Sequence, residues 1–259
     1  MTKPVLHYFE LADEVVTFST TRHGGVSKGK LATLNINPHR GDEPSAVAEN
    51  LQAVATEIGV EADKIIRLHQ IHETHCLTVT DAFLNLSAAE QYEMEEGKDA
   101  VVTDCRNVCI GVHTADCVPI LFYDPVHHAI GAAHAGWRGT VQRIAQHTLH
   151  KMTELYGTDP KDLKAVVGPC ISQKNFEVGQ EVYDAFSAAG FPMERIARMY
   201  EKWHIDLPLC NQLQLEELGV PAANIFQSGI CTYDNASDFF SARILKEGFG
   251  TIYTGIALK

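Results

Sequence analysis

Hydrophobic and polar residues follow two different periods along the chain, so both helices and strands are expected. Residues 15–20 are rich in β-branched and aromatic side chains and predict a strand, which a glycine-rich turn follows. Residues 44–59 carry apolar side chains at three- and four-residue intervals, which predicts a helix capped by Gly59. Short strands are expected at residues 65–68 and 77–79.

The rest of the chain contains adjacent apolar runs rather than a strict alternation of strands and helices. Strands are predicted at residues 100–102, 108–112, 118–123, 129–133, 165–167, 224–226 and 251–253. Helices are predicted at residues 140–156, 179–188 and 210–218, and the acidic segment 82–98 is expected to be a solvated loop or a surface helix. Because the strands come in adjacent runs, the pattern favours an α+β layered sheet structure over a doubly wound parallel sheet.

Composition narrows the class of protein. The 259 residues fit one layered domain, residues 1–259, although two small domains would also fit. A net charge of −12 argues against general binding to nucleic acid or to an anionic membrane, since phosphate contacts need clustered Lys and Arg. No apolar stretch is long enough to span a membrane, and we see no signal peptide. We therefore expect a cytoplasmic protein whose seven cysteines are free thiols or ligands.

Three peptides place metal-binding side chains at the ends of expected strands: residues 69–72, 114–119 and 132–140. They contain His72, Cys117 and His134, and one thiolate with two imidazoles is a good zinc set that leaves a fourth position open. No short zinc-finger spacing supports this hypothesis. Taken singly, Cys117 also fits a buried small apolar residue, and His134 a core histidine bonded to a carbonyl group.

Four further residues are candidates for binding an anionic substrate: Arg22, Asn35, Arg40 and Arg138. The first three lie in a polar, glycine-containing segment that could receive phosphate, and Arg138 precedes an expected helix. The alternative is that they belong to a solvated surface loop or to ordinary surface ion pairs.

The three peptides, in this order, resemble the YfiH or peptidoglycan editing factor family, also called the laccase-domain or polyphenol oxidase family. The most specific motifs are Ala-Asp-Cys-Val-Pro at 115–119 and His-Ala-Gly-Trp-Arg-Gly at 134–139. The resemblance implies a sandwich of sheets flanked by helices. It also implies that zinc is held by His72, Cys117 and His134, whereas His69 is not a ligand.

The resemblance further implies phosphorolysis of purine nucleosides (adenosine, inosine, guanosine and methylthioadenosine), deamination of adenosine, and copper-dependent oxidation of phenols in vitro. Cys117, His134 and Asp116 are the expected catalytic residues. A role in editing peptidoglycan precursors is implied for bacteria. Ile244 and Thr251 stand where relatives often carry arginine, which bears on substrate choice. The expected partners are a nucleoside and phosphate, and the expected state is a monomer or weak oligomer.

Three alternatives remain open at this point. Cys117 and His134 could form the nucleophile and base of an amide hydrolase, a role in conflict with zinc binding because a metal-bound thiolate is a poor nucleophile. A true multicopper oxidase needs paired His-x-His peptides, and the sequence contains none. A non-enzymatic metal-binding module would close the zinc site with a fourth donor such as His75 or His113.

Overall fold

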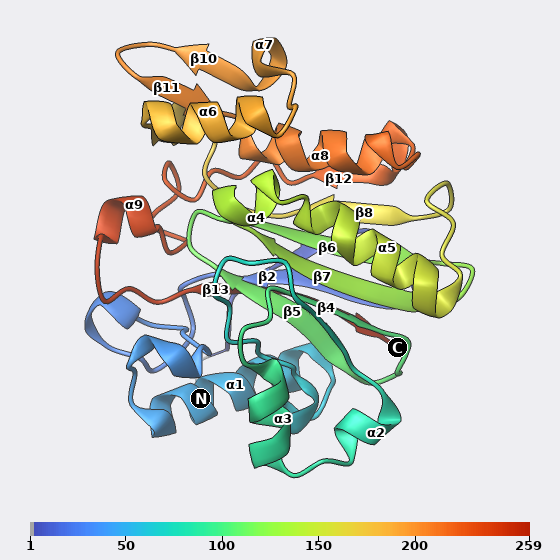
Figure 1. Ribbon diagram of the computed structural model, residues 1–259. Helices are drawn as coiled ribbons and strands as arrows, with labels where there is room; N and C mark the ends of the chain where they lie inside the picture. The colour runs from blue at the N-terminus through green and yellow to red at the C-terminus, as the bar shows by residue number, and fades with distance from the viewer. Residues whose placement is uncertain (1–2) are drawn as a thin grey trace.

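The structure, a computed structural model, describes residues 3–259 and consists of two stacked β-sheets with helices on their outer faces (Figure 1). The larger sheet has six strands, with the order β12-β8-β6-β7-β4-β3. Their bounds are β12 (Ile225–Gln227), β8 (Lys164–Val167), β6 (Val118–Asp124), β7 (Ala129–Ala135), β4 (Ala100–Thr103) and β3 (Cys76–Thr78). The two outermost pairs are parallel and the three inner pairs antiparallel.

The second sheet has four antiparallel strands in the order β1-β2-β13-β5. Their bounds are β1 (Leu6–Phe9), β2 (Val15–Thr20), β13 (Ile252–Leu258) and β5 (Cys109–Thr114). A separate three-stranded sheet contains β10 (Ala197–Met199), β11 (Trp203–Ile205) and β9 (Glu177–Val178), with β11 in the middle.

The main core lies between the two large sheets. Ile110 and Ile256 from the four-stranded sheet pack in one cluster with Leu121, Ile130 and Val166 from the six-stranded sheet, and all five are buried. Every residue of β6 and of β7 is buried, because both faces of these central strands are covered. The sequence of β6 and β7 is continuously apolar rather than alternating, as expected for strands that are buried on both faces.

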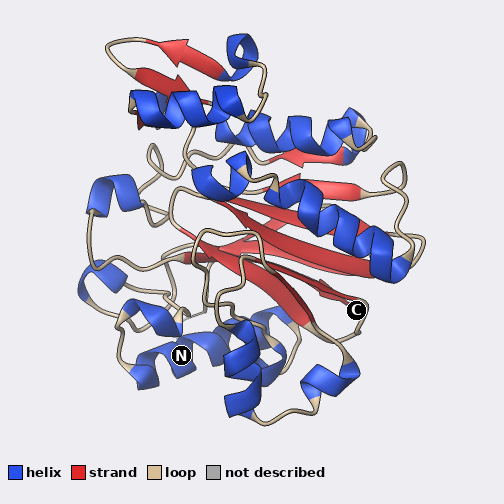
Figure 2. Ribbon diagram, in the orientation of Figure 1, coloured by secondary structure: helices blue, strands red, loops and turns tan. Residues whose placement is uncertain are grey.

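Helices cover the two outer faces of the sandwich, as the colouring by secondary structure makes plain (Figure 2). On the six-stranded sheet lie α5 (Ile144–Tyr156) and α8 (Leu207–Glu217), and on the four-stranded sheet lies α1 (Pro44–Ile58). Farther out, α6 (Gln180–Ala188) packs against β11 of the small sheet (Figure 1). The shorter helices are α2 (Asp81–Leu84), α3 (Ala88–Glu95), α4 (Trp137–Val141), α7 (Met193–Ile196) and α9 (Ala242–Leu245). Single 3₁₀ turns occur at Gly29–Leu31, Pro38–Arg40, Ala62–Lys64, Gln173–Asn175 and Ala222–Asn224.

The predicted α+β layered class and most predicted elements are confirmed, but two elements differ. The strand expected at 65–68 is wrong: this segment forms a single bridge, from Ile65 to Cys109, and is buried without entering a ladder. The single helix expected at 140–156 is two helices, α4 and α5, separated at Arg143, whose φ is 65°. The guanidinium group of Arg143 donates to Ala189 O and lies 3.8 Å from the ring centre of Phe191, contacts that compensate for the left-handed backbone.

Within residues 3–259, no helix has the length and apolar character needed to cross a bilayer.

Candidate metal centre

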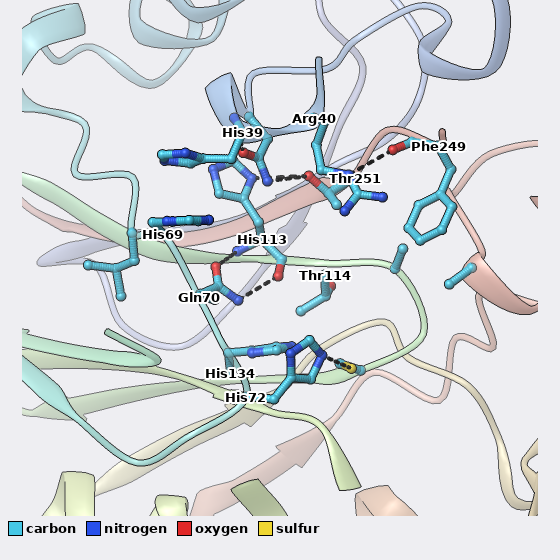
Figure 3. A pocket seen from close by; sticks show the side chains of 15 residues that line it. His39, Arg40, His69, Gln70, His72, His113, Thr114, His134, Phe249 and Thr251 are labelled. Atoms are coloured by element: carbon cyan, nitrogen blue, oxygen red, sulfur yellow. Dashed lines mark hydrogen bonds between the residues drawn. The ribbon is translucent and has the colours of Figure 1, made fainter. Parts of the chain in front are cut away.

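His72, Cys117 and His134 come from three different segments and converge on one point. Figure 3 shows two of them, His72 and His134, side by side. Their ligand atoms all lie within 4.8 Å of one another, and Cys117 Sγ is 3.9 Å from His72 Nε2. The two imidazole rings meet edge to face, with their centres 4.8 Å apart. His134 is buried, whereas His72 is exposed, so the cluster sits at the boundary between the sandwich and solvent.

The register of the β6–β7 hairpin explains why Cys117 and His134 meet. Val118 pairs with Ala135 and Pro119 with His134, so Cys117, one residue before β6, lies beside the end of β7. Gly136 follows at this end and has no side chain to obstruct the cluster. A Cβ atom at Gly136 would lie 2.9 Å from His72 Cδ2 and 3.1 Å from Cys117 Sγ, so the site requires glycine there.

Asp99 holds the two histidines in place through its buried carboxylate. One oxygen accepts the backbone N–H of His72 at 3.0 Å and the Nδ1–H of His134 at 2.7 Å. The other accepts the backbone N–H groups of Ile71 at 3.1 Å and Glu73 at 2.9 Å. These bonds stabilise the left-handed backbone of His72, whose φ is 68°, and leave Nε2 of His134 free for a metal.

Asp116, predicted as catalytic, has a structural role in this geometry. Its backbone is left-handed, with φ 80°, and its buried carboxylate accepts hydrogen bonds from the Thr232 and Ser241 hydroxyl groups and from the Arg243 backbone N–H. With both oxygens engaged, the side chain supports the turn that presents Cys117 and does not line the cavity. Asp116 therefore positions the neighbouring ligand.

The electrostatics of the cluster favour a thiolate. Burial alone would raise the pKa of Cys117, but charge interaction and hydrogen bonding with His134, and then with His72, lower it to about 6. Burial would likewise lower the pKa of His134, but the Cys117 thiolate and the Asp99 carboxylate raise it to about 9. The metal-free protein therefore carries a thiolate–imidazolium pair near neutral pH, and a cation can replace the shared proton.

The donor set fits a tetrahedral divalent metal. Zinc–sulfur and zinc–nitrogen bonds of about 2.3 and 2.1 Å imply a separation of about 3.6 Å between sulfur and nitrogen ligands. The 3.9 Å between Cys117 and His72 needs only a small contraction to reach it. Two further donors considered from the sequence do not join the cluster within residues 3–259: His75 pairs with Glu73 at 3.0 Å, and His113 lies elsewhere on the cavity wall. Three protein ligands with an open fourth position are the pattern of a catalytic zinc site.

The three candidate ligands face a cavity of about 240 Å³. Across it lies Arg40, whose guanidinium stacks 4.3 Å from the ring centre of Phe249 and whose Nε donates to Phe249 O (Figure 3). No residue among those described accepts a hydrogen bond from its terminal nitrogens, which are therefore available to a ligand. The remaining wall includes a stacked pair of imidazoles, His39 and His69, with centres 4.1 Å apart.

Of the four residues predicted to bind substrate, only Arg40 reaches this cavity. Arg22 donates to the carbonyl oxygens of Ala32 and Ala236, so its side chain ties two loops together. Asn35 is fully buried and donates to Asp42. Arg138 is exposed and stacks on Trp137. The positions of Arg22, Asn35 and Arg138 therefore give no support to direct substrate contact.

Sequence reasoning missed several residues of the site. Asp99 holds both histidines, yet nothing in its local pattern distinguishes it from another acidic residue before a strand. Gln70 exchanges two hydrogen bonds with the backbone of His113, its side chain bridging to β5. Phe249 reaches the cavity from the C-terminal end of the chain, beside Thr251, a position that the sequence had already linked to substrate choice. The local sequence carries no signal for these contacts, because they depend on how distant segments pack.

The comparisons with known proteins agree with this geometry. The family model described as multi-copper polyphenol oxidoreductase laccase matches residues 16–259. The chain belongs to this laccase family. The resemblance inferred from the motifs is thereby confirmed.

Individual relatives cover nearly the whole chain. A purine nucleoside phosphorylase of Bacteroides thetaiotaomicron is 41% identical, over 99% of this chain and 97% of its own length. An adenosine deaminase, RL5, from an unknown prokaryotic organism is 37% identical over 98% of each chain. The crystal structure of the Bacillus licheniformis hypothetical protein YfiH superposes with a TM-score of 0.91 at 31% identity, covering 99% of this chain and 97% of that one. These likenesses confirm the layered fold of the laccase family.

Proposed function

We propose that this laccase-family protein is a zinc-dependent purine nucleoside phosphorylase. The observation that carries the proposal is a single cavity with a three-ligand set, His72, Cys117 and His134, on one wall and the free end of Arg40 on another. This arrangement suits an anionic nucleophile and a polar substrate together. Relatives named purine nucleoside phosphorylase, one of them 41% identical over nearly the whole chain, support the same substrate class.

Phosphorolysis forms a bond from a phosphate oxygen to the anomeric carbon of the ribose and breaks the bond from that carbon to the purine. The bonding electrons leave with the base, which then takes up a proton. Most of the catalysis can come from positioning the two reactants and stabilising charge. Arg40 is suited to the phosphate, because its fixed guanidinium presents its terminal N–H groups toward the cavity.

When bound, zinc would supply a Lewis acid beside the reacting groups. Its proposed ligands are kept in place by residues that do not touch the substrate. Asp99 fixes the ring orientation of His134 and the loop of His72, and Asp116 fixes the turn of Cys117. In this proposal Cys117 and His134 act as metal ligands, and Asp99 and Asp116 as positioning residues.

The position of His72 supports a metal site rather than the active site of a cysteine hydrolase. A nucleophile–base pair needs one imidazole beside the thiol, and His134 with Asp99 behind it would satisfy that need. Here a second imidazole, that of His72, approaches the same sulfur. Two imidazoles and one thiolate around a point are better explained by a cation. Both zinc and copper are compatible with the donor set and with the description of the family. We propose zinc because the open fourth position suits Lewis-acid chemistry.

Deamination of adenosine is a second candidate, because the relative RL5 bears that name. Deamination consumes water rather than phosphate. Release of ammonia from adenosine without phosphate would therefore identify it separately from phosphorolysis. Editing of peptidoglycan precursors, a cytoplasmic location, a single domain and a monomeric or weakly oligomeric state remain predictions.

The deciding experiment measures hypoxanthine and ribose 1-phosphate formed from inosine and phosphate, with bound zinc and copper quantified in the same samples. Cys117→Ala should lose both zinc and turnover. Cys105→Ala is the matched control, since Cys105 is a partly exposed thiol remote from the cavity, and it should retain both. Wild-type protein that holds zinc but cleaves no nucleoside would refute the substrate and leave the metal ligands in place. Rapid alkylation of Cys117 that zinc does not prevent would instead favour the hydrolase.

A further inference from the structure

Two thiols outside the metal centre lie side by side where β8 and β12 end. Beyond these parallel strands the two chain segments stay adjacent, and Cys170 and Cys231 form a direct bridge pair. Cys170 N–H donates to Ile230 O at 3.1 Å, and Thr232 N–H donates to Cys170 O at 3.0 Å. Both cysteines are free thiols.

The pairing brings the two side chains within reach of each other. Residues paired across neighbouring strands point to the same face, and neighbouring strands lie about 4.8 Å apart. A disulfide needs a Cα separation of about 4.4 to 6.8 Å, so the backbone already meets its main requirement. Both cysteines are buried, but they line the same cavity of about 280 Å³, through which a small reagent can approach the pair.

The two sulfurs have different surroundings. Cys231 Sγ accepts hydrogen bonds from the Ser172 backbone N–H and the Asn175 side-chain amide, both at 3.3 Å. Such donors stabilise the negative charge of an attacking sulfur. Burial raises the pKa of Cys170 well above its ordinary value, so before oxidation its sulfur is a protonated, weak nucleophile that gives up its proton only when it attacks the sulfenic acid. Cys231 is therefore suited to react first and Cys170 to react second.

We propose that Cys170 and Cys231 form a redox-active dithiol site that hydroperoxides oxidise to a reversible disulfide. The Cys231 sulfur attacks one peroxide oxygen, the O–O bond breaks, and a sulfenic acid and one water are formed from hydrogen peroxide. The Cys170 sulfur then attacks the Cys231 sulfur, the S–O bond breaks, and a second water leaves with the thiol proton. The dithiol loses two electrons and the peroxide gains them.

The position of the pair connects it to the metal centre. Ile171, next to Cys170, donates its N–H to Asp116 O at 2.9 Å, and Thr232, next to Cys231, donates its hydroxyl to the Asp116 carboxylate at 2.7 Å. Asp116 in turn precedes Cys117. A disulfide that shifts either segment therefore strains the turn that presents the Cys117 sulfur, and the oxidised protein should release zinc several-fold faster than the reduced protein.

The test treats zinc-loaded, full-length protein with hydrogen peroxide and maps cross-links by peptide mass spectrometry. Trypsin leaves Cys170 in the peptide 165–174 and Cys231 in the peptide 203–243, which also holds Cys210, so fragmentation must place the bond at Cys231. The expected result is a cross-link between these peptides that a dithiol reductant reverses. Cys170→Ser should stop at a Cys231 sulfenic acid, trapped by dimedone, and the control Cys105→Ser should still cross-link.

Three results would overturn the proposal: oxidation of Cys231 that never cross-links, a cross-link that appears only in urea-unfolded protein, and a bond placed at Cys210. Because the wild-type protein supplies the main readout, a poorly folded variant cannot obscure the answer. Equal rates of zinc release to a chelator from oxidised and reduced protein would refute the connection to Asp116. None of these measurements depends on nucleoside turnover.

Discussion

Replacing Asp99 by Asn tests whether the metal centre needs the residue that orients its histidines, because the change leaves all three proposed ligands in place. The change is nearly isosteric, but an amide has one acceptor oxygen where the carboxylate has two. Each carboxylate oxygen of Asp99 accepts two hydrogen bonds: one takes His72 N–H and His134 Nδ1–H, and the other takes Ile71 N–H and Glu73 N–H. With its NH₂ group toward Ile71 and Glu73, the amide meets two N–H donors and two of the four bonds are lost. With its NH₂ group toward His72 and His134, it loses the His72 bond and keeps the His134 bond only if Nδ1 accepts, which moves the ring proton to Nε2, the nitrogen that faces the metal.

The expected magnitudes follow from this count. Hydrogen bonds to a charged group contribute about 1.5 to 3 kcal/mol each, so losing one or two costs about 1.5 to 6 kcal/mol of folding free energy. At about 2 to 4 °C per kcal/mol for a chain of this size, Tm should fall by roughly 3 °C or more. Loss of a group that orients a metal-ligating histidine typically weakens metal affinity about 10- to 100-fold, and we expect that range for Asp99→Asn.

Asp124→Asn is the matched control. Asp124 is also fully buried and accepts the N–H groups of Val126 and His127 and the Nδ1–H of His127, but it is the last residue of β6, before the β6–β7 turn and away from the cavity. This variant should lose comparable stability and keep its zinc affinity. Thermal unfolding of the metal-free proteins and competition with a zinc chelator measure the two quantities independently.

The result that would refute this reasoning is an Asp99→Asn protein that is destabilised but binds zinc as tightly as the wild type. Asp99 would then serve the fold alone, and the orientation of His134 and His72 would have another source. Equal losses of zinc affinity in Asp99→Asn and Asp124→Asn would also contradict it, because general destabilisation would explain both.

Three further changes probe other parts of the molecule. Gly136→Ala should weaken zinc binding at least tenfold, because the added Cβ would lie 2.9 Å from His72. The control Gly139→Ala, whose added Cβ has no contact closer than 3.4 Å, should leave zinc binding unchanged. Competition with a zinc chelator compares the two variants. Arg40→Ala should raise the KM for phosphate more than that for inosine, and Arg22→Ala should change neither; an unchanged phosphate dependence would remove Arg40 from the site. The stability difference between wild type and Asp124→Asn should be largest near neutral pH and vanish in acid. Although burial opposes it, hydrogen bonds from the His127 ring and from the backbone N–H groups of His127 and Val126 hold the pKa of Asp124 below its ordinary 3.8. This stabilisation is therefore complete above that value and is lost as the pH falls through the lower folded-state value. Urea unfolding at several pH values checks this, and a difference that persists at the acid end would count against it.

Much of the fold follows from local sequence patterns. The continuous apolar runs of β6 and β7 predict strands buried on both faces, and the periodic apolar residues of α1 predict its length to within one residue of the observed end at Ile58. These predictions succeed because period and turn residues are local properties. The break at Arg143 has no such signal, since neither Gly nor Pro stands there; contacts with Ala189 and Phe191 permit it.

The sequence by itself determined which residues could hold a metal, because ligand chemistry is a property of the side chain and the motifs around Cys117 and His134 are contiguous. Only the tertiary structure decided what surrounds them. Arg40 and Arg22 lie in similar polar segments, yet one faces the cavity and the other binds loop carbonyl groups. Asp99 became the support of two ligands because packing of the sandwich brings a strand end beneath the His72 loop. Such contacts join residues far apart in the chain, and their energies depend on geometry that no local pattern encodes.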